Sequence, residues 1–180
     1  MIERCVNNYD MQRENGLRTR IRREFKYLAN ADTDKNLNIR LMNDEDAVAL
    51  SAIEQEVFSM PWTVNDFLEM NAHDEVAYLV AEYDGEIIGG CGVRNVLGDG
   101  EITNVVIKEK FRGRGYAKCM LEKLFELGRS LGAKDFTLEV RVSNEPAIKL
   151  YESFGFVSEG IRPNFYEKPV EDANIMWLRG

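Results

Sequence analysis

The sequence predicts a mixed α/β (α+β) fold for a single domain. Three observations support this prediction: apolar runs typical of strands, stretches whose apolar residues recur at helical spacing, and glycine-containing turns between them. In chain order these segments predict the succession β-α-α-β-β-β-α-β-α-β-β. A chain of 180 residues fits one domain of ordinary size with a short extension, and two full domains would be crowded.

The first 37 residues differ from the rest, so we divide the chain into an N-terminal extension, residues 1–37, and a domain, residues 38–180. The extension carries a net charge of +2 and the domain a net charge of −10. The apolar residues of the extension recur at helical spacing among arginines: Leu17, Ile21, Phe25 and Leu28. We interpret it as a basic helix docked on the body, followed by a polar linker, with a membrane-surface or RNA contact as the alternative.

The predicted domain begins with a short strand at 39–41 and two helices. Asn43 or Asp44 can cap the first helix, because a side-chain oxygen there accepts a free backbone N–H. The apolar residues of this helix recur with a 3.6-residue period: Ala47, Leu50, Ile53 and Val57. After a break, Thr63 with Asp66 three residues later resembles a capping box for a second, short helix.

A hairpin and a further strand are predicted next. Val76–Tyr83 and Glu86–Val93 are apolar runs separated by Asp84-Gly85, which is a strong short-range signal for a tight hairpin. A second glycine-containing turn at 98–100 then leads into the strand Glu101–Lys108.

The second half of the domain alternates between helices and strands. A long helix follows a glycine-rich loop and ends before Gly132, a natural terminator. In the strand Phe136–Val142, alternate residues from Phe136 to Val142 are apolar and share one face. The remaining elements are expected at three places: a helix from Asn144 to Gly155 and short strands near Phe156–Ser158 and Asn174–Leu178.

Composition and charge exclude several classes of protein. No run approaches the ~20 apolar residues that a membrane span requires, and the N-terminal residues lack the apolar segment of a secretory signal. Three widely spaced cysteines favour a reducing compartment, and a single histidine, His73, excludes histidine-rich zinc sites. We therefore expect a cytoplasmic protein without a metal. The acidic body disfavours nucleic acid and favours amines or basic peptides as partners.

The segment from Val105 to Ala117, VVIKEKFRGRGYA, has the densest chemical signal. A β-branched strand here leads through an RGRG turn into a helix. Backbone N–H groups at a helix start bind phosphate oxygens, and glycines permit close approach. The segment is neither a Walker A motif nor a Rossmann G-x-G-x-x-G pattern. Taken alone, it is explained equally well as a tight strand-to-helix turn with solvated arginines.

A second motif downstream favours the phosphate-binding interpretation of the RGRG segment over a purely structural turn. Six residues complete the pattern N-x-x-A-x-x-L-Y-x-x-x-G-F: Asn144, Ala147, Leu150, Tyr151, Gly155 and Phe156. With both motifs in this order, the sequence resembles the GNAT superfamily of acyl-CoA-dependent N-acetyltransferases. The resemblance implies a mixed, mostly antiparallel twisted sheet of about six to seven strands flanked by helices. It also implies a pyrophosphate site for coenzyme A made by Arg112, Gly113, Arg114, Gly115, Tyr116 and Ala117.

A closer likeness is to the RimI-like branch, the ribosomal-protein-alanine N-acetyltransferases that modify a protein α-amino terminus. The likeness is carried by 58–63, 138–144 and 171–176, and it covers residues 38–179. Where that branch has Arg-x-x-Tyr-Tyr, this chain has Arg162-Pro163-Asn164-Phe165-Tyr166. The change removes one hydroxyl from a loop that grips the substrate backbone in related enzymes, so the acceptor is less closely specified than the reaction.

Direct acyl transfer needs an uncharged amine and a proton for the departing thiolate. An α-amine has a pKa of about 8, against ~10.4 for lysine, so a single carboxylate suffices as its base. Glu139 is the first candidate base, since it lies opposite the apolar face of its strand and aligns with the base of the RimI-like branch; an ion pair with a neighbour such as Arg141 is the alternative. Glu101 is the second candidate, with a solvated strand end as its alternative. Tyr151 is the implied acid, with a core tyrosine as its alternative.

Other site residues are assigned by the resemblance or by position. The resemblance gives the pantetheine amides a strand-like backbone partner: Val105, Val106 and Ile107. Asn144 either contacts the pantetheine arm or caps its helix. The walls of the peptide site are expected from four residues, although core packing explains Trp62 equally well: Phe58, Pro61, Trp62 and Tyr166. Cys91 and Cys119 are expected to be small core residues rather than nucleophiles.

The function implied by the resemblance is direct transfer of the acetyl group of acetyl-CoA to a primary amine, with the α-amino terminus of a basic protein as the favoured acceptor. One alternative is acetylation of a small-molecule amine. An alternative of another class is a non-catalytic acyl-CoA-binding module. The expected partners are therefore acetyl-CoA and an amine, with neither nucleic acid nor membrane, and the chain is expected to be a monomer or homodimer.

Overall fold

The computed structural model describes residues 34–180, so the expected basic helix lies outside the described residues. Residues 34–180 form a seven-stranded sheet in the order β1-β2-β3-β4-β5-β7-β6. The strands are β1 (Leu37–Leu41), β2 (Val76–Tyr83), β3 (Glu86–Val96), β4 (Asp99–Ile107), β5 (Asp135–Arg141), β6 (Val157–Glu167) and β7 (Val170–Leu178). The helices are α2 (Ala47–Val57), α3 (Val64–Asn71), α4 (Tyr116–Ser130) and α5 (Glu145–Glu152), with 3-10 turns η1 (Asp44–Asp46) and η2 (Glu109–Phe111).

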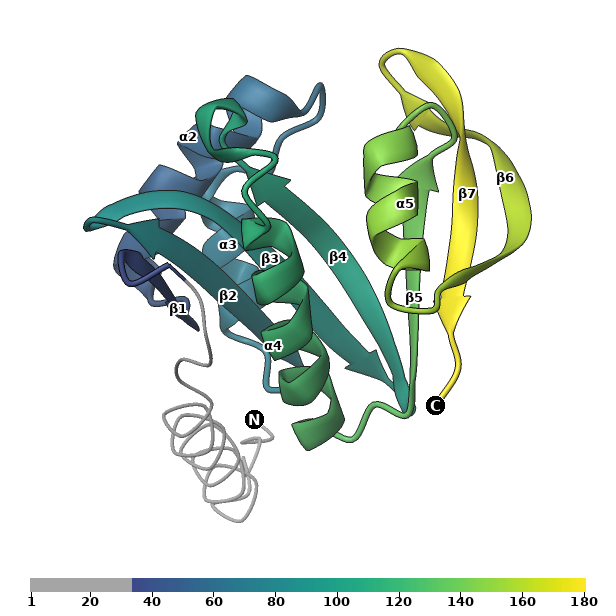
Figure 1. Ribbon diagram of the computed structural model, residues 1–180, viewed down its shortest axis with the longest axis horizontal. Coiled ribbons are helices and arrows are strands. Elements are labelled where there is room, and N and C mark those ends of the chain that lie inside the picture. Colours follow the sequence, from purple (N-terminus) through teal and green to yellow (C-terminus); the bar gives the residue numbers. More distant parts are fainter. Residues whose placement is uncertain (1–33) are drawn as a thin grey trace, which may run out of the picture.

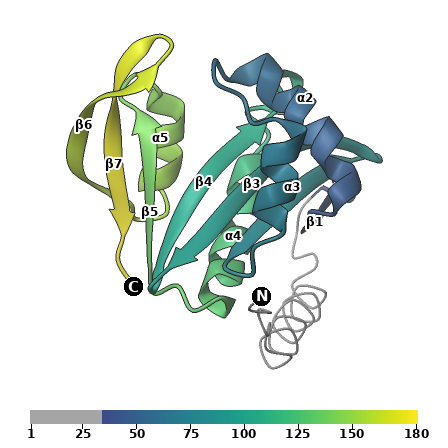
Figure 2. The same ribbon diagram turned by 180° about the vertical axis from the view of Figure 1, so that it is seen from behind.

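The helices cover both faces of the sheet. Figure 1 shows α4 and α5 on one face, and Figure 2 shows α2 and α3 on the other. The order of the elements and the mostly antiparallel pairing confirm the predicted fold class. No helix within residues 34–180 is long and apolar enough to cross a membrane.

Local sequence signals explain several of these elements. Asp84 and Gly85 have positive φ angles of 50° and 82°, as a tight turn between β2 and β3 requires. The Thr63 hydroxyl accepts the N–H of Asp66, and the Asp66 carboxylate accepts the N–H of Thr63 at 2.7 Å, which confirms the capping box of α3. Gly132 follows α4 with a φ of 98°, as predicted for a helix terminator.

Strands β4 and β5 form the one parallel pair among the described strands, and they diverge along their length. They pair over three positions only, ending at Glu101 opposite Thr137, and Figure 1 shows them separating beyond this point. At Thr103–Asn104, β4 has one residue more than the facing segment of β3. Because such a bulge bends its strand, β4 turns away from β5.

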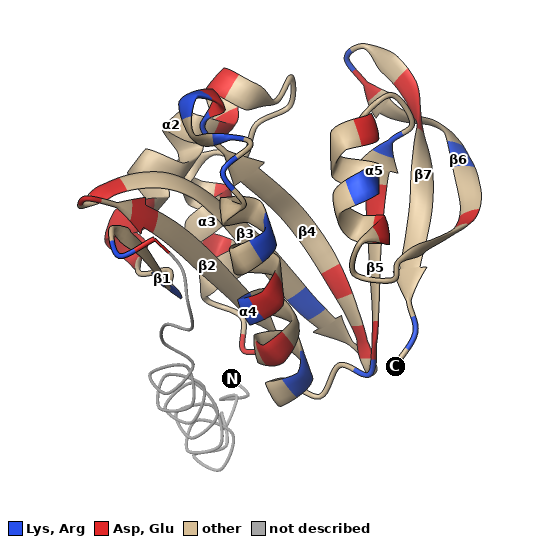
Figure 3. Ribbon diagram, viewed as in Figure 1, with Lys and Arg blue, Asp and Glu red and all other residues tan. Residues whose placement is uncertain are grey.

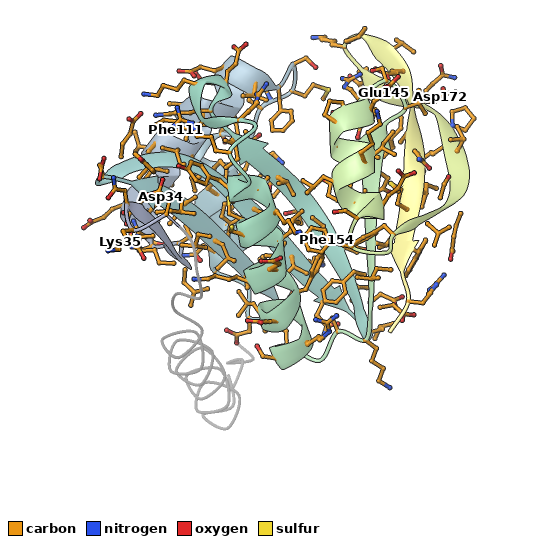
Figure 4. All side chains as sticks on the ribbon, in the orientation of Figure 1. Asp34, Lys35, Phe111, Glu145, Phe154 and Asp172 are labelled. Carbon is orange, nitrogen blue, oxygen red and sulfur yellow. The ribbon has the colours of Figure 1, made fainter. Side chains whose placement is uncertain are left out.

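Aromatic packing joins the two halves of the sheet. The ring of Phe136 in β5 is fully buried and lies 5.1 Å, centroid to centroid, from that of Phe125 in α4. Phe154, in the turn after α5 and labelled in Figure 4, packs on the same Phe125 at 5.2 Å. On the opposite face of the sheet, Phe67 of α3 packs edge-on against Tyr78 of β2 at 5.4 Å. The sheet is therefore sandwiched between two apolar layers.

The last two strands are longer than the sequence predicts. The prediction places short strands near 156–158 and 174–178, whereas β6 and β7 continue to a turn at 168–169. β6 is an edge strand with mostly exposed side chains, so it lacks the alternation that marks a half-buried strand. The expectation that Val142 shares the buried face of β5 is wrong, because the strand ends at Arg141 and Val142 is 41% exposed.

Candidate active site

A pocket of about 530 Å³ lies where β4 and β5 diverge. Its walls come from the loop between α2 and α3, from β4 and β5, from α5, and from the turn between β6 and β7. It brings together seven of the residues that the sequence analysis assigned to catalysis, cofactor or substrate: Phe58, Trp62, Val105, Glu139, Asn144, Tyr151 and Tyr166. Phe58 and Tyr166, which are 108 positions apart in the chain, thus meet at one pocket.

Glu139 presents a carboxylate to the pocket from β5. Its neighbours Leu138 and Val140 are buried on the other face of the strand, as the alternation predicts. The Glu139 side chain is 35% exposed, and its Oε1 accepts a hydrogen bond from Arg162 at 3.1 Å. The sequence analysis gave an ion pair as the alternative to a role of Glu139 as catalytic base. The structure shows such a pair, but with Arg162 of β6 rather than with Arg141. Since this pair is open to solvent, the carboxylate stays accessible to an amine or a water molecule.

Tyr151 presents a phenol to the same pocket from the last turn of α5. Its side chain is 7% exposed and packs on Phe156, with 5.8 Å between ring centroids. Burial raises the pKa of Tyr151 well above its ordinary value of 10.0. The hydroxyl therefore keeps its proton at neutral pH and can donate it to a group that becomes basic in the pocket. The alternative of a core tyrosine is confirmed by its burial, and because the residue also lines the pocket, its role as an acid stays a prediction.

Asn144 caps α5, since its Oδ1 accepts the N–H of Ala147 at 3.3 Å. The capping interpretation of this residue is confirmed. Asn144 also lines the pocket, so its amide nitrogen can meet a ligand there.

A stacked pair forms the outer wall of the pocket. The Arg141 guanidinium lies 4.1 Å from the ring centroid of Tyr166 and is paired with Glu171 at 2.9 Å. The Tyr166 hydroxyl donates a hydrogen bond to the backbone carbonyl of Glu139 at 3.1 Å. Burial raises the pKa of Tyr166, and the positive charge of Arg141 opposes that rise. Arg141 had no site role in the sequence analysis, where it appeared only as a partner for Glu139.

The RGRG loop lies outside the pocket, between η2 and the start of α4. Gly113 and Gly115 have φ angles of 74° and 83°, the left-handed region that glycine adopts without strain. Gly115 is the N-cap residue of α4, and no side chain caps this helix. The first N–H groups of α4 can therefore bind an anion. Arg112 is turned toward β4, where its Nε donates to the carbonyl of Ile107 at 3.0 Å.

One edge of β4 faces the divergence. Val106 and Ile107 pair with Gly90 and Gly89 of β3, and their side chains are buried. On the β5 side the pairing has already ended at Glu101. The backbone of this part of β4 can therefore pair with an extended ligand that enters between the strands.

Glu101, the second candidate base, is not brought to the pocket. It is exposed and lies where β4 still pairs with both neighbours, opposite Arg94 and Thr137. Figure 3 shows the acidic positions of β4 near the end where it meets β5. Cys91 is fully buried in the core, and His73 is exposed beside Glu75. Within residues 34–180 no cluster of His, Cys, Asp and Glu side chains suits a metal ion.

The sequence analysis missed a buried carboxylate at the edge of the pocket, that of Glu54 in α2. Glu54 is 2% exposed, and burial raises its pKa, partly offset by hydrogen bonds from Trp62 and Asn104. A signal was present in the sequence. Glu54 lies four residues after Leu50 and three before Val57, and therefore on the apolar stripe of its helix.

Comparisons with known proteins agree with this geometry. Residues 47–156 match the acetyltransferase (GNAT) family. A relative from Bacillus subtilis (strain 168), provisionally named a ribosomal protein bS18-alanine N-acetyltransferase, is 40% identical over 78% of this chain and 93% of its own. The structure of the ribosomal-protein-S18-alanine N-acetyltransferase from Escherichia coli superimposes with a TM-score of 0.72 at 30% identity, over 79% of this chain and 93% of that one. A Salmonella typhimurium protein solved with its cofactor acetyl-CoA shares the fold at 20% identity and a TM-score of 0.71, over 81% and 94%.

Proposed function

This chain belongs to the GNAT acetyltransferase family, and from that premise we propose that it transfers the acetyl group of acetyl-CoA to the α-amino terminus of a protein. The observation that carries the proposal is the meeting of a carboxylate, Glu139, and a protonated phenol, Tyr151, in one pocket beside the open edge of β4. We assign the catalytic domain to residues 38–180 and leave residues 1–37 as an extension to it.

Three proton transfers accompany the acyl transfer. Acetyl-CoA supplies the activated acyl carbon. Glu139, directly or through one water molecule, takes a proton from the α-ammonium group of the acceptor. The freed amine nitrogen forms a bond with the carbonyl carbon, and the carbon–sulfur bond breaks. Tyr151 donates its proton to the departing sulfur, which leaves as the coenzyme A thiol. The acylated nitrogen then gives its surplus proton, through water, to the phenolate of Tyr151 and becomes the neutral amide. The products are therefore an N-acetylated terminus and the coenzyme A thiol, and the proton taken from the ammonium group stays on Glu139 until it is released to solvent.

The donor site is built from backbone groups. The N–H groups at the start of α4 and the positive charges of Arg112 and Arg114 suit the diphosphate of coenzyme A. The exposed edge of β4 at Val105, Val106 and Ile107 suits the pantetheine amides, which would pair as an additional strand does. Tyr116, Ala117 and Asn144 complete this assignment. Together these groups direct the thioester into the divergence between β4 and β5.

The acceptor enters between the loop at 58–62 and the turn between β6 and β7. Phe58, Pro61, Trp62 and Tyr166 are its walls, and all but Pro61 line the pocket. The net charge of −10 over residues 38–180 favours a basic acceptor. Since the relatives are named for the alanine of ribosomal protein bS18, the N-terminal alanine of that protein is the acceptor we propose, which also suits a cytoplasmic enzyme.

A thiol-release assay with acetyl-CoA tests this proposal. The acceptors are a basic peptide with a free N-terminal alanine, the same peptide with its α-amine blocked, and a polyamine. We expect thiol release with the first only. The blocked peptide keeps its lysine side chains, so the absence of thiol release with it would show that lysine amines are not the acceptors. Glu139→Gln is expected to lose most of this activity, about 10²-fold or more, while still binding acetyl-CoA.

Three results would overturn the proposal. Equal turnover of the blocked peptide would place the acceptor on lysine, and turnover of the polyamine alone would make the protein a small-molecule acetyltransferase. Stabilisation by acetyl-CoA without thiol release on any amine would make it a binding module.

A further inference from the structure

Two side chains of α2 hold the main chain of Trp62 in the acceptor wall. The Ser51 hydroxyl donates a hydrogen bond to the Trp62 carbonyl at 3.0 Å, and the Trp62 N–H donates to Glu54 Oε2 at 3.1 Å. Ser51 and Glu54 lie one helical turn apart, and they are 3% and 2% exposed. Both main-chain polar groups of Trp62 are thus satisfied by side chains on one face of the helix.

The second oxygen of Glu54 reaches a different element. Its Oε1 accepts a hydrogen bond from Asn104 Nδ2 at 2.5 Å, and Asn104 lies in the bulge of β4. The Asn104 amide oxygen is in turn 3.2 Å from the hydroxyl of Thr103. One buried carboxylate therefore connects the acceptor wall to the strand along which the donor is proposed to lie.

Burying a carboxylate is costly unless hydrogen bonds replace its water. Within residues 34–180 no lysine or arginine pairs with Glu54, so its two amide donors provide that compensation. The catalytic steps described above do not use Glu54, because Glu139 and Tyr151 carry the proton transfers. A role for Glu54 must therefore come from what it connects.

We propose that Glu54 is a positioning residue, which fixes the segment Phe58–Trp62 of the acceptor wall at a set distance from β4. This inference rests on the proposed acceptor site. When the hydrogen bonds of Glu54 to Trp62 and Asn104 are lost, the segment Phe58–Trp62 moves relative to the thioester. The acceptor is then bound more weakly, and its amine is placed less accurately against the acyl carbon. The RGRG loop and α4 are not part of this connection, so donor binding is retained. Small displacements of a reacting group are enough to produce such losses.

The test compares four variants of the full-length protein with the wild type. Glu54→Met keeps the volume but removes both acceptors, and we expect kcat/KM for the alanine peptide to fall about tenfold or more, a loss of ~1.4 kcal/mol or greater. The Kd for acetyl-CoA is expected to stay within about twofold. Glu54→Gln is expected to recover most of the activity, since its oxygen can accept the Trp62 N–H while the Asn104 amide flips to accept its NH₂ group.

The other two variants separate positioning from stability. Ser51→Ala removes the other hydrogen bond to the main chain of Trp62, and we expect a loss of about threefold in kcat/KM. Asp46→Asn alters a comparably buried carboxylate near the start of the same helix, paired with Arg40 away from the pocket. It is expected to lower the melting temperature without changing the peptide KM.

Several outcomes would overturn the inference. It fails if Glu54→Met keeps wild-type kcat/KM, or if Asp46→Asn lowers peptide turnover as much as Glu54→Met does. If Glu54→Met does not fold, wild-type peptide kinetics in Ser51→Ala would overturn it instead. A wild-type protein inactive on every peptide contradicts the proposed function, which is a separate failure from unchanged kinetics in these variants.

Discussion

Replacing Tyr151 by phenylalanine removes one oxygen from the pocket and leaves the ring packed on Phe156. The size of the effect follows from the leaving group. A thiol with a pKa of ~8.5 lies about 1.5 units above pH 7, so expelling it as a bare thiolate costs ~2 kcal/mol, or about 30-fold in rate. Positioned general acids contribute ~10²- to 10⁴-fold, so we expect kcat for thiol release to fall about 30- to 100-fold.

The pH dependence provides a second readout for Tyr151. Because burial raises its pKa above 10.0, the wild-type enzyme loses no activity through ionisation of this phenol up to that pH. The Kd for acetyl-CoA, measured by calorimetry, is expected to stay within about twofold in Tyr151→Phe.

Tyr83→Phe is the matched control, because it removes a phenolic oxygen from β2, outside the pocket, and is expected to leave kcat unchanged. Wild-type turnover in Tyr151→Phe would refute the role of this residue as an acid. A fall in kcat matched by an equal loss of acetyl-CoA affinity would refute it as well.

Three further predictions concern the fold and the loop. Arg40 lowers the pKa of Glu82 from 4.5, so their ion pair stabilises the protein above that pH, and its contribution is lost as the pH falls through the lower folded-state pKa. The difference in unfolding free energy between Glu82→Gln and wild type in urea, about 0.5–1 kcal/mol at pH 7, should therefore shrink as the pH is lowered below 4.5, and a constant difference would contradict this. Gly115→Ala forces an L-residue into the left-handed region and is expected to cost ~1–2 kcal/mol in urea unfolding and to weaken acetyl-CoA binding in calorimetry; unchanged binding would argue against a diphosphate at this loop. Phe136→Ala removes a fully buried ring and is expected to cost ~3–5 kcal/mol in the same unfolding assay, and a loss below ~1 kcal/mol would show that the ring is not central to the core.

Elements with a local signal could be predicted from the sequence. The turn at Asp84-Gly85 and the capping box at Thr63 depend on a few adjacent residues, and the structure confirms both. β6 depends instead on pairing with β7 and has mostly exposed side chains, so no alternation marks its length. Asn164, with a φ of 52°, interrupts it at a place that the sequence analysis took for a loop.

The residues of the candidate site show the same difference between local motifs, which could be predicted, and distant contacts, which could not. Glu139 and Tyr151 lie in motifs with fixed spacing, and the structure brings both to one pocket. The burial of Glu54 depends on Asn104, fifty positions away, and no local pattern shows that contact. Glu101 had a suitable residue type at a strand start, but the splay of the sheet decides which part of β4 reaches the pocket. That splay depends on a bulge, which the sequence does not mark.

The central claim is that coenzyme A binds with its diphosphate on the first turn of α4 and its pantetheine arm along β4. A crystal structure of the complex with coenzyme A tests it most directly. The account predicts diphosphate oxygens within hydrogen-bonding distance of the N–H groups of residues 113–117 and the sulfur beside the hydroxyl of Tyr151. A nucleotide bound elsewhere on the protein, or a sulfur on the far side of the sheet from Tyr151, would contradict it.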